Sequence, residues 1–166
     1  MRVDPLRRLT GRHRPEPFPG LPPIPVEPIG WVRNDVTDPR RHDWSGVRSA
    51  IVLRPELAAA LDGLAGFSHV IVVCWLDRVT EAERRLTRVH PAGDPRLPAR
   101  GVLALRTHHR PNPIGVSVVR LEGIAGAVVR VRGLDAADRT PVLDLKPYVP
   151  HYDSVPDARL PDWALG

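Results

Sequence analysis

Short apolar stretches rich in valine, leucine and isoleucine recur along this chain, and polar or turn-forming residues separate them. The stretch 67–76 is apolar nearly throughout after His69, which is typical of a central strand covered on both faces. Several neighbouring stretches are joined too tightly to pair in parallel. The pattern predicts six or seven short strands, with candidates at 28–32, 47–53, 67–76, 101–105, 115–122, 127–131 and 142–145.

Helical signals are few. Pro55 stands at the first turn of a short predicted helix over 56–61, and Gly63 lies near its end. Residues 77–100 are charged and contain three prolines, so they predict a long excursion with one helical turn at 81–86. Residues 123–126 predict a hairpin turn. We therefore expect a mainly β protein, an antiparallel sheet closed or nearly closed into a barrel, with one short helix and a long excursion.

The first 28 residues differ from the rest, because eight of them are proline and five are arginine. This composition predicts an extended, basic segment without a core of its own. It is either an arm that binds RNA or a partner subunit, or a solvated extension.

The composition narrows the functional classes. The chain of 166 residues carries a net charge of +5, which permits an anionic partner such as RNA. The longest apolar run, 70–76, is too short to cross a membrane, and no apolar stretch follows the basic N-terminus as a leader peptide would require. The single cysteine, Cys74, lies in that run and is expected to be a buried apolar residue, so we expect a cytoplasmic protein.

Common catalytic fingerprints are absent from the sequence. Neither a glycine-rich dinucleotide motif nor a P-loop is present, and Ser117 lacks the context of a hydrolase nucleophile. Adjacent His108 and His109 have no cysteine or histidine pair at ligand spacing, so we expect no metal site.

Polar groups gather instead in three stretches, 106–117, 134–141 and 142–154. The first contains Arg110-Pro-Asn-Pro-Ile-Gly115, which proline makes rigid and suitable as a binding scaffold. In the third, Asp144 and the only lysine, Lys146, would share one strand face. The two charges are either a surface pair of little energetic value or part of a site.

Together these stretches resemble the TsaA/TrmO family of tRNA N6-methyltransferases across roughly residues 29–158, which leaves 159–166 as a C-terminal tail. The resemblance rests on four blocks: Gly63-Leu-Ala-Gly-Phe-Ser-His69, Leu105-Arg-Thr-His-His-Arg-Pro-Asn-Pro-Ile-Gly-Val-Ser117, Leu134-Asp135 with Asp138-Arg-Thr-Pro141, and Leu143-Asp-Leu-Lys-Pro-Tyr-Val-Pro150 with Asp153-Ser154.

The resemblance implies a single-sheeted β-barrel, a homodimer and S-adenosylmethionine as cofactor. It implies methyl transfer to N6 of threonylcarbamoyl-modified adenosine beside the anticodon of tRNA. The cofactor-binding residues that it implies are Arg106, Ile114, Gly115, Val116, Ser117, Asp135, Asp138, Arg139 and Thr140.

Transfer to nitrogen also requires loss of a proton. Asp144 and Tyr148 are the candidates for accepting it, with Lys146 orienting the acceptor. Arg106 could pair with the cofactor's carboxylate, and Asp135 or Asp138 with its ammonium group.

Three positions depart from the family pattern. The first loop reads Asp38-Pro-Arg-Arg-His-Asp-Trp-Ser-Gly46 in place of Pro-Arg-Gln, Asp77-Arg78 follows the Phe-Ser-His strand, and Asp138-Arg139-Thr140 replaces Asp-Gly-Thr. A small-molecule methyltransferase therefore stays open as an alternative to a tRNA enzyme. A non-enzymatic RNA-binding barrel is a further alternative, although aromatic residues are only 5% of the chain.

Overall fold

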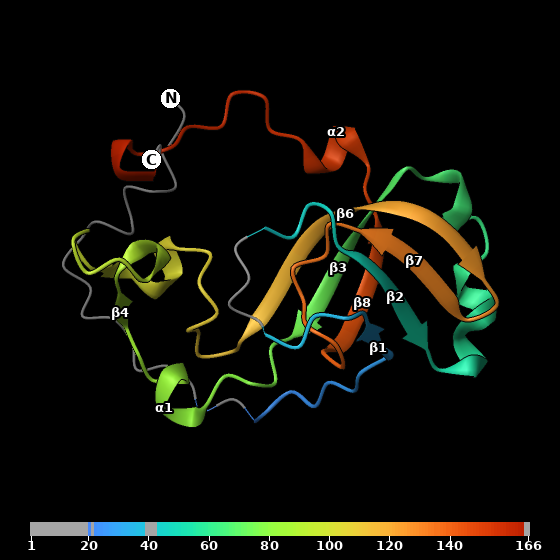
Figure 1. Cartoon of the computed structure of the whole chain (residues 1–166), viewed down its shortest axis with the longest axis horizontal. Helices are drawn as coiled ribbons and strands as arrows, with labels where there is room; N and C mark the ends of the chain where they lie inside the picture. The colour runs from blue at the N-terminus through green and yellow to red at the C-terminus, as the bar shows by residue number, and fades with distance from the viewer. Residues whose placement is uncertain (1–19, 21, 39–42, 165–166) are drawn as a thin grey trace, which may run out of the picture.

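A closed antiparallel barrel of six strands forms the centre of the computed structural model, which describes residues 20, 22–38 and 43–164 (Figure 1). Around the barrel the strand order is β1-β2-β7-β6-β3-β8, and β8 closes the ring by pairing with β1. The strands are β1 (Gly30–Arg33), β2 (Arg48–Leu53), β3 (His69–Trp75), β6 (Ile114–Ala125), β7 (Val128–Arg132) and β8 (Pro141–Pro147). The predicted fold class is confirmed.

The barrel interior is filled mainly by β-branched side chains from alternate strand positions. Val70, Val72 and Cys74 of β3 point inward, whereas the residues between them are only partly covered. Val129 and Val131 of β7 meet them in the same core. The alternation of period two thus produces one apolar interior and an outer surface of mixed character.

Gly30 of β1 marks a close approach of two strands. A β-carbon at this position would lie 2.3 Å from the carbonyl oxygen of Val52 in β2. Only glycine therefore permits the backbones to pack at this point.

The longest strand, β6, is irregular where it pairs with β7. Its pairing with β7 shifts register between Leu121 and Gly123, which marks a β-bulge. The turn that follows contains Gly126 at φ +56°, a left-handed conformation that glycine adopts without strain. The predicted hairpin is confirmed, although β6 extends further toward the turn than expected, to Ala125.

The excursion after β3 forms a small unit beside the barrel (Figure 1). It holds the helical turn α1 (Glu81–Arg84) and a two-stranded sheet of β4 (Arg88–Val89) and β5 (Arg100–Gly101). Short 3-10 turns at Pro91–Gly93 and Val102–Ala104 complete it.

The strand predicted at 101–105 is wrong beyond Gly101. The amide of Val102 still donates to Thr87, but the chain then turns, and the amide of Leu105 donates back to the carbonyl of Val102. Arg110 donates to the carbonyl oxygens of Val102 and Leu105, at 3.2 and 2.6 Å. These carbonyls therefore have a side-chain partner in place of a neighbouring strand.

Other helical segments are brief. The helix predicted at 56–61 is a 3-10 helix over Pro55–Leu61, a second 3-10 turn spans Leu64–Gly66, and α2 covers Pro150–Asp153. No helix among the described residues is long and apolar enough to cross a membrane. Most of the predicted proline-rich extension lies outside the described residues.

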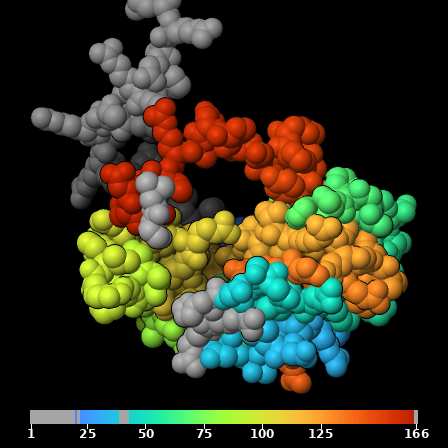
Figure 2. All heavy atoms as spheres, turned by 45° about the horizontal axis from the view of Figure 1, so that its top comes forward, coloured from blue at the N-terminus to red at the C-terminus, as the bar shows by residue number. Residues whose placement is uncertain are grey.

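The C-terminal segment returns from α2 toward the excursion, as the red chain in Figure 2 shows. A 3-10 turn at Asp162–Ala164 ends it, and the guanidinium of Arg100 lies 5.1 Å from the ring centre of Trp163. This cation–π contact joins two segments far apart in sequence.

Candidate functional site

The loop 135–140 is fastened to the start of the chain's first long loop. Asn34 donates its side-chain amide to Ser49 and to the carbonyl of Ala136, both at 2.9 Å. Its backbone amide donates to the Asp138 carboxylate at 3.1 Å. Backbone bonds from Asp138 to Val36 and from Arg139 to Val32 complete the attachment. The loop is therefore held at one end of the barrel with little freedom.

Two of the predicted cofactor-binding segments meet there. The Ser117 hydroxyl of β6 donates to the Asp135 carboxylate, which joins residues 18 positions apart. The Arg106 guanidinium donates to the carbonyl of Val116, one residue earlier on the same strand. The three stretches around Arg106, β6 and loop 135–140 are thus linked in space.

The four predicted cofactor-binding residues of β6 do not all point to the same side of the sheet. Gly115 and Ser117 pair with the inward-facing Cys74 and Val72, whereas Ile114 and Val116 point outward and are about 40% exposed (42% and 43%). Because side chains alternate along a strand, only the inward pair and the shared backbone can line the barrel end. Thr140 is also buried, so its side chain supports the loop from within.

Arg139 occupies a position that suits glycine. Its φ of +68° lies in the left-handed region, where a β-carbon costs about 1 kcal/mol. The Asp-Gly-Thr family pattern of the sequence analysis has glycine at this position, and the conformation gives a physical reason for it. Arginine keeps the turn at some cost and adds a cation to the surface.

A pocket of about 280 Å³ lies beside this loop and is lined by Trp31, Arg33, Asp138 and Arg139. Trp31 and Arg33 are outward-facing positions of β1, and Trp31 is 45% exposed. An aromatic face next to two guanidinium groups suits a nucleotide, through stacking and contact with phosphate.

Sequence reasoning did not assign a role to Asn34 or Arg78. Arg78 donates to the carbonyls of Thr37 and Asp138, at 2.6 and 3.0 Å, and so joins the first loop to loop 135–140. The sequence feature that could have pointed to Arg78 is its departure from the family pattern at a position directly after a buried strand. A long donor placed there can reach two loops at once.

The predicted catalytic residues lie on a different surface. Asp144 and Lys146 form an ion pair of 2.6 Å on the outer face of β8, next to Val73 and Ile71 of β3. This hydrogen bond raises the pKa of Lys146, so the ammonium form is favoured. The prediction that both charges share one strand face is confirmed, but they face away from the interior that Ser117 lines.

Tyr148 follows directly after β8. Its backbone amide donates to the carbonyl of His69 at 3.1 Å, and the two rings meet edge to face at 6.4 Å. The tyrosine is thus placed at the far end of β8 from the loop 135–140.

Cys74 lies on the inner face of β3 near Asp135. Burial raises the pKa of its thiol to about 12, and the nearby carboxylate adds to the effect. The thiol stays protonated at neutral pH and behaves as an apolar core group, as predicted.

Known proteins share this barrel and these motifs. Residues 34–154 match the family described as tRNA-methyltransferase O N-terminal domain. A probable S-adenosyl-L-methionine-binding protein of Methanothermobacter thermautotrophicus is 41% identical over 136 residues, covering 80% of this chain and 95% of its own. A putative S-adenosylmethionine-dependent methyltransferase of Pseudomonas aeruginosa, RcsF, is 42% identical over 144 residues, covering 81% and 61%.

Solved structures agree with these matches. A crystal structure of TrmO superposes with a TM-score of 0.69 at 36% identity, covering 83% of this chain and 63% of that one. A TrmO structure from Pseudomonas aeruginosa gives a TM-score of 0.66 at 37% identity, covering 82% and 61%. This chain therefore spans only about six tenths of the length of the TrmO chains.

The barrel and the linked β6 and 135–140 segments define the protein's class, that of the β-barrel methyltransferases. Within this class the chain belongs to the TrmO family.

Proposed function

We propose that this protein binds S-adenosylmethionine at the barrel end and methylates N6 of threonylcarbamoyl-modified adenosine beside the anticodon of tRNA. The observation that carries the proposal is the junction of Ser117 with Asp135, because it joins the two segments that the resemblance assigns to the cofactor. The basic net charge of +5 is consistent with an RNA substrate.

The residues of the junction suit the cofactor. S-adenosylmethionine supplies an activated methyl group next to a cationic sulfur. Asp135 and Asp138 offer carboxylates to its positive groups, and Arg106 offers a guanidinium to its carboxylate. The backbone of β6 around Gly115 offers amide and carbonyl groups that can hold a flat ring.

For the acceptor, the pocket lined by Trp31, Arg33, Asp138 and Arg139 supports contact with RNA. Trp31 offers a stacking face, and the two arginines offer donors to phosphate. Asp144, Lys146 and Tyr148 remain our candidates for handling the acceptor's proton and orienting its base. They could act in the same reaction as the Ser117–Asp135 junction if a second subunit brings its β8 face to this barrel end.

A homodimer would provide that arrangement. The outer faces of β3 and β6 carry a strip of apolar residues in which Val118 lies beside Ile71 and Val116 beside Val73. Val118 is 52% exposed, and the strip continues into the Asp144–Lys146 pair. We infer that this strip is covered by a second copy in the cytoplasm. Val118→Asp should shift the mass in light scattering toward a monomer, whereas Leu160→Asp, on the exposed C-terminal segment, should leave it unchanged.

Mass spectrometry of tRNA from a deletion strain tests the activity directly. The methylated form of threonylcarbamoyladenosine should disappear and return with the wild-type gene. Asp135→Asn should abolish rescue together with cofactor binding, whereas Asp144→Asn should abolish rescue with cofactor binding intact. Unchanged tRNA in the deletion strain would refute the tRNA activity.

A small-molecule methyltransferase is the second candidate. The first loop departs from the family pattern, and Arg78, which also departs from it, donates to the carbonyl of Thr37 in this loop. Binding of S-adenosylmethionine together with unchanged tRNA modification would favour this candidate. A purified protein that binds RNA but no S-adenosylmethionine would instead indicate a non-enzymatic RNA-binding barrel.

A further inference from the structure

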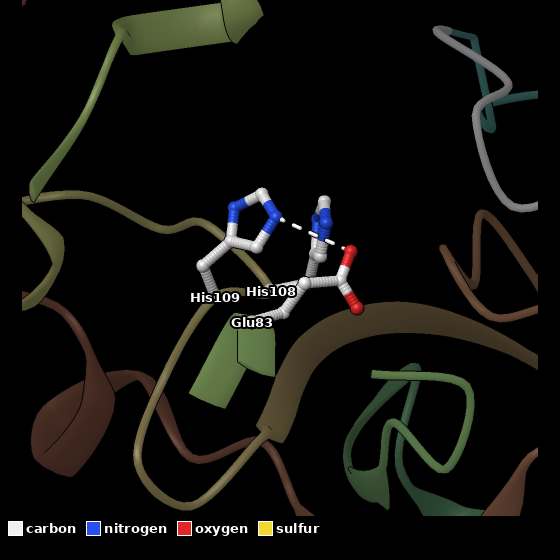
Figure 3. Close-up of side chains that lie close together, drawn as sticks. All are labelled: Glu83, His108 and His109. Atoms are coloured by element: carbon white, nitrogen blue, oxygen red, sulfur yellow. Dashed lines mark ion pairs between the residues drawn. The ribbon is translucent and has the colours of Figure 1, made fainter. Parts of the chain in front are cut away.

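Three side chains with metal-binding atoms meet beside the barrel, away from the Ser117–Asp135 junction. They are Glu83 of α1 and the adjacent His108 and His109 of the rigid loop before β6, and their ligand atoms all lie within 4.8 Å of one another. Figure 3 shows the carboxylate and both imidazole rings turned toward a common space. No spacing in the sequence predicts the third ligand, because Glu83 lies in the helical turn α1, far along the chain from His108.

We propose that Glu83, His108 and His109 form a mononuclear Zn²⁺ site with one open coordination position. Two histidines and one glutamate are a recurring ligand set for zinc that keeps a fourth position for water or a substrate atom. Zinc ligands at bond lengths of about 2.0–2.1 Å lie about 3.3 Å apart in a tetrahedral site. Binding of the ion would therefore draw the ligand atoms, now up to 4.8 Å apart, closer together.

One pair of ligands is already near that distance. Nε2 of His109 lies 3.6 Å from Oε1 of Glu83. The rings of His108 and His109 lie 3.9 Å apart at an interplanar angle of 43°, so the second imidazole stands beside the same carboxylate.

Glu83 and His109 are each oriented by hydrogen bonds to the side-chain atom that does not face the proposed ion. Oε2 of Glu83 accepts from the backbone amide and the hydroxyl of Thr80, at 2.8 and 2.7 Å, which leaves Oε1 for the ion. Nδ1 of His109 lies 3.2 Å from the Thr107 hydroxyl, which leaves Nε2 for the ion. Such outer contacts fix the ring orientation and tautomer of metal ligands.

The two segments that carry the ligands are also held together. Arg84 donates to the carbonyl of Pro111 at 3.0 Å and lies over the ring of Trp75, 5.6 Å from its centre. Arg110 is engaged by the carbonyls of Val102 and Leu105. These nearby cations therefore have partners other than the Glu83 carboxylate.

Isothermal titration of the metal-free full chain with ZnCl₂ tests the site. We expect one Zn²⁺ per chain, and a loss of affinity of more than about 100-fold in Glu83→Gln and in His109→Ala, since loss of a group that only hydrogen-bonds to a ligand already costs about 10–100-fold. Thr107→Val should lie in that smaller range. His151→Ala is the matched control, because this histidine lies on α2, outside the cluster, and its loss should leave the affinity unchanged.

Substitution with Co²⁺ gives an independent reading. Strong visible bands of a four-coordinate ion should appear in the wild type and vanish in His108→Ala. Circular dichroism of each variant separates loss of ligand from loss of fold. The proposal is overturned if the wild type takes up no zinc, or if binding persists undiminished in correctly folded Glu83→Gln and His109→Ala proteins.

Discussion

The loop 135–140 and the excursion 77–104 both carry candidate chemistry, but they are held in place differently. The loop is fixed by backbone bonds to β1 and by Asn34, whose amide reaches the buried Ser49. The excursion is fixed mainly by side chains: Arg84 to Pro111, Arg110 to Val102, and Arg100 against Trp163. The loop should therefore open only when the barrel unfolds, whereas the excursion should open locally.

Chemical labelling of cysteine should show the largest contrast. Because burial raises the pKa of Cys74 to about 12, its thiolate fraction at pH 8 is about 1,000-fold below that of an unperturbed thiol, before access is considered. A Cys74→Ala, Leu97→Cys variant, with its thiol at an exposed position of the excursion, should react at the rate of a free thiol. Rates measured with a thiol reagent, with and without denaturant, check this. Rapid labelling of the native wild type would show that the barrel end opens readily.

The pH dependence of stability follows from the same group. A raised pKa keeps the folded thiol protonated while the unfolded thiol ionises, so stability falls as pH rises from about 9 toward 12. Cys74→Ala should weaken this fall. Urea titrations of the two proteins at pH 8 and 10 measure it, and equal falls would contradict the burial argument.

Asn34→Ala should destabilise the whole barrel. It removes donors from Ser49 and the Ala136 carbonyl, and an acceptor from the Val36 amide at 3.0 Å, so we expect a loss of about 2–4 kcal/mol. Urea unfolding followed by tryptophan fluorescence measures it. Thr37→Ala, at an exposed neighbouring position of the same loop, is the control. A loss below about 0.5 kcal/mol for Asn34→Ala would show that the loop is not tied to the barrel as described.

Thr80→Ala should affect the excursion alone. Removing the capping box of α1 costs about 1 kcal/mol locally, whereas Thr80→Ser keeps the hydroxyl. In the presence of a chelator, trypsin should cleave faster within 84–100 while the urea midpoint stays unchanged. A shift of the midpoint as large as that of Asn34→Ala would mean that barrel and excursion unfold together.

Arg139→Gly should have the smallest effect, a gain of up to about 1 kcal/mol, because glycine relieves the positive φ. Its ion pair with Asp138 is long, 3.8 Å, and exposed, so its loss matters little. Arg139→Ala keeps the β-carbon and should give no gain. Thermal unfolding of the wild type, Arg139→Gly and Arg139→Ala measures the three stabilities, and an equal gain in both variants would contradict the argument from the positive φ.

The barrel could be predicted from sequence because its strands are short apolar runs with tight connections. The excursion and its helical turn at Glu81–Arg84 were also predicted. The end of the excursion was not, since residues 102–105 are as apolar as a strand but find a side-chain partner, Arg110, in place of a neighbouring strand. The contact between Glu83 and His109 could not be predicted from the spacing of residues in the sequence, because it depends on how α1 packs against the loop before β6.

The Asp144–Lys146 pair on β8 shows that simple alternation along a strand does not always predict which face a residue occupies. Val142 and Asp144 have the same parity, so simple alternation places them on one face. The pairing with β3 shifts register between Val73 and Cys74, and this irregularity leaves Val142 inside and Asp144 outside. Sequence predicted that Asp144 and Lys146 lie together, but not which side of the barrel they occupy.

The closed ring of strands also affects how such a protein can diversify. Since β8 pairs with β1, the barrel keeps its hydrogen bonds whatever the length of the segments that leave it. The first loop and the excursion can therefore accumulate substitutions, insertions or a new ligand without opening a strand edge. The substrate of the barrel can thus change during evolution while its strands and core stay the same. A search for functional divergence among relatives should begin in the first loop and the excursion.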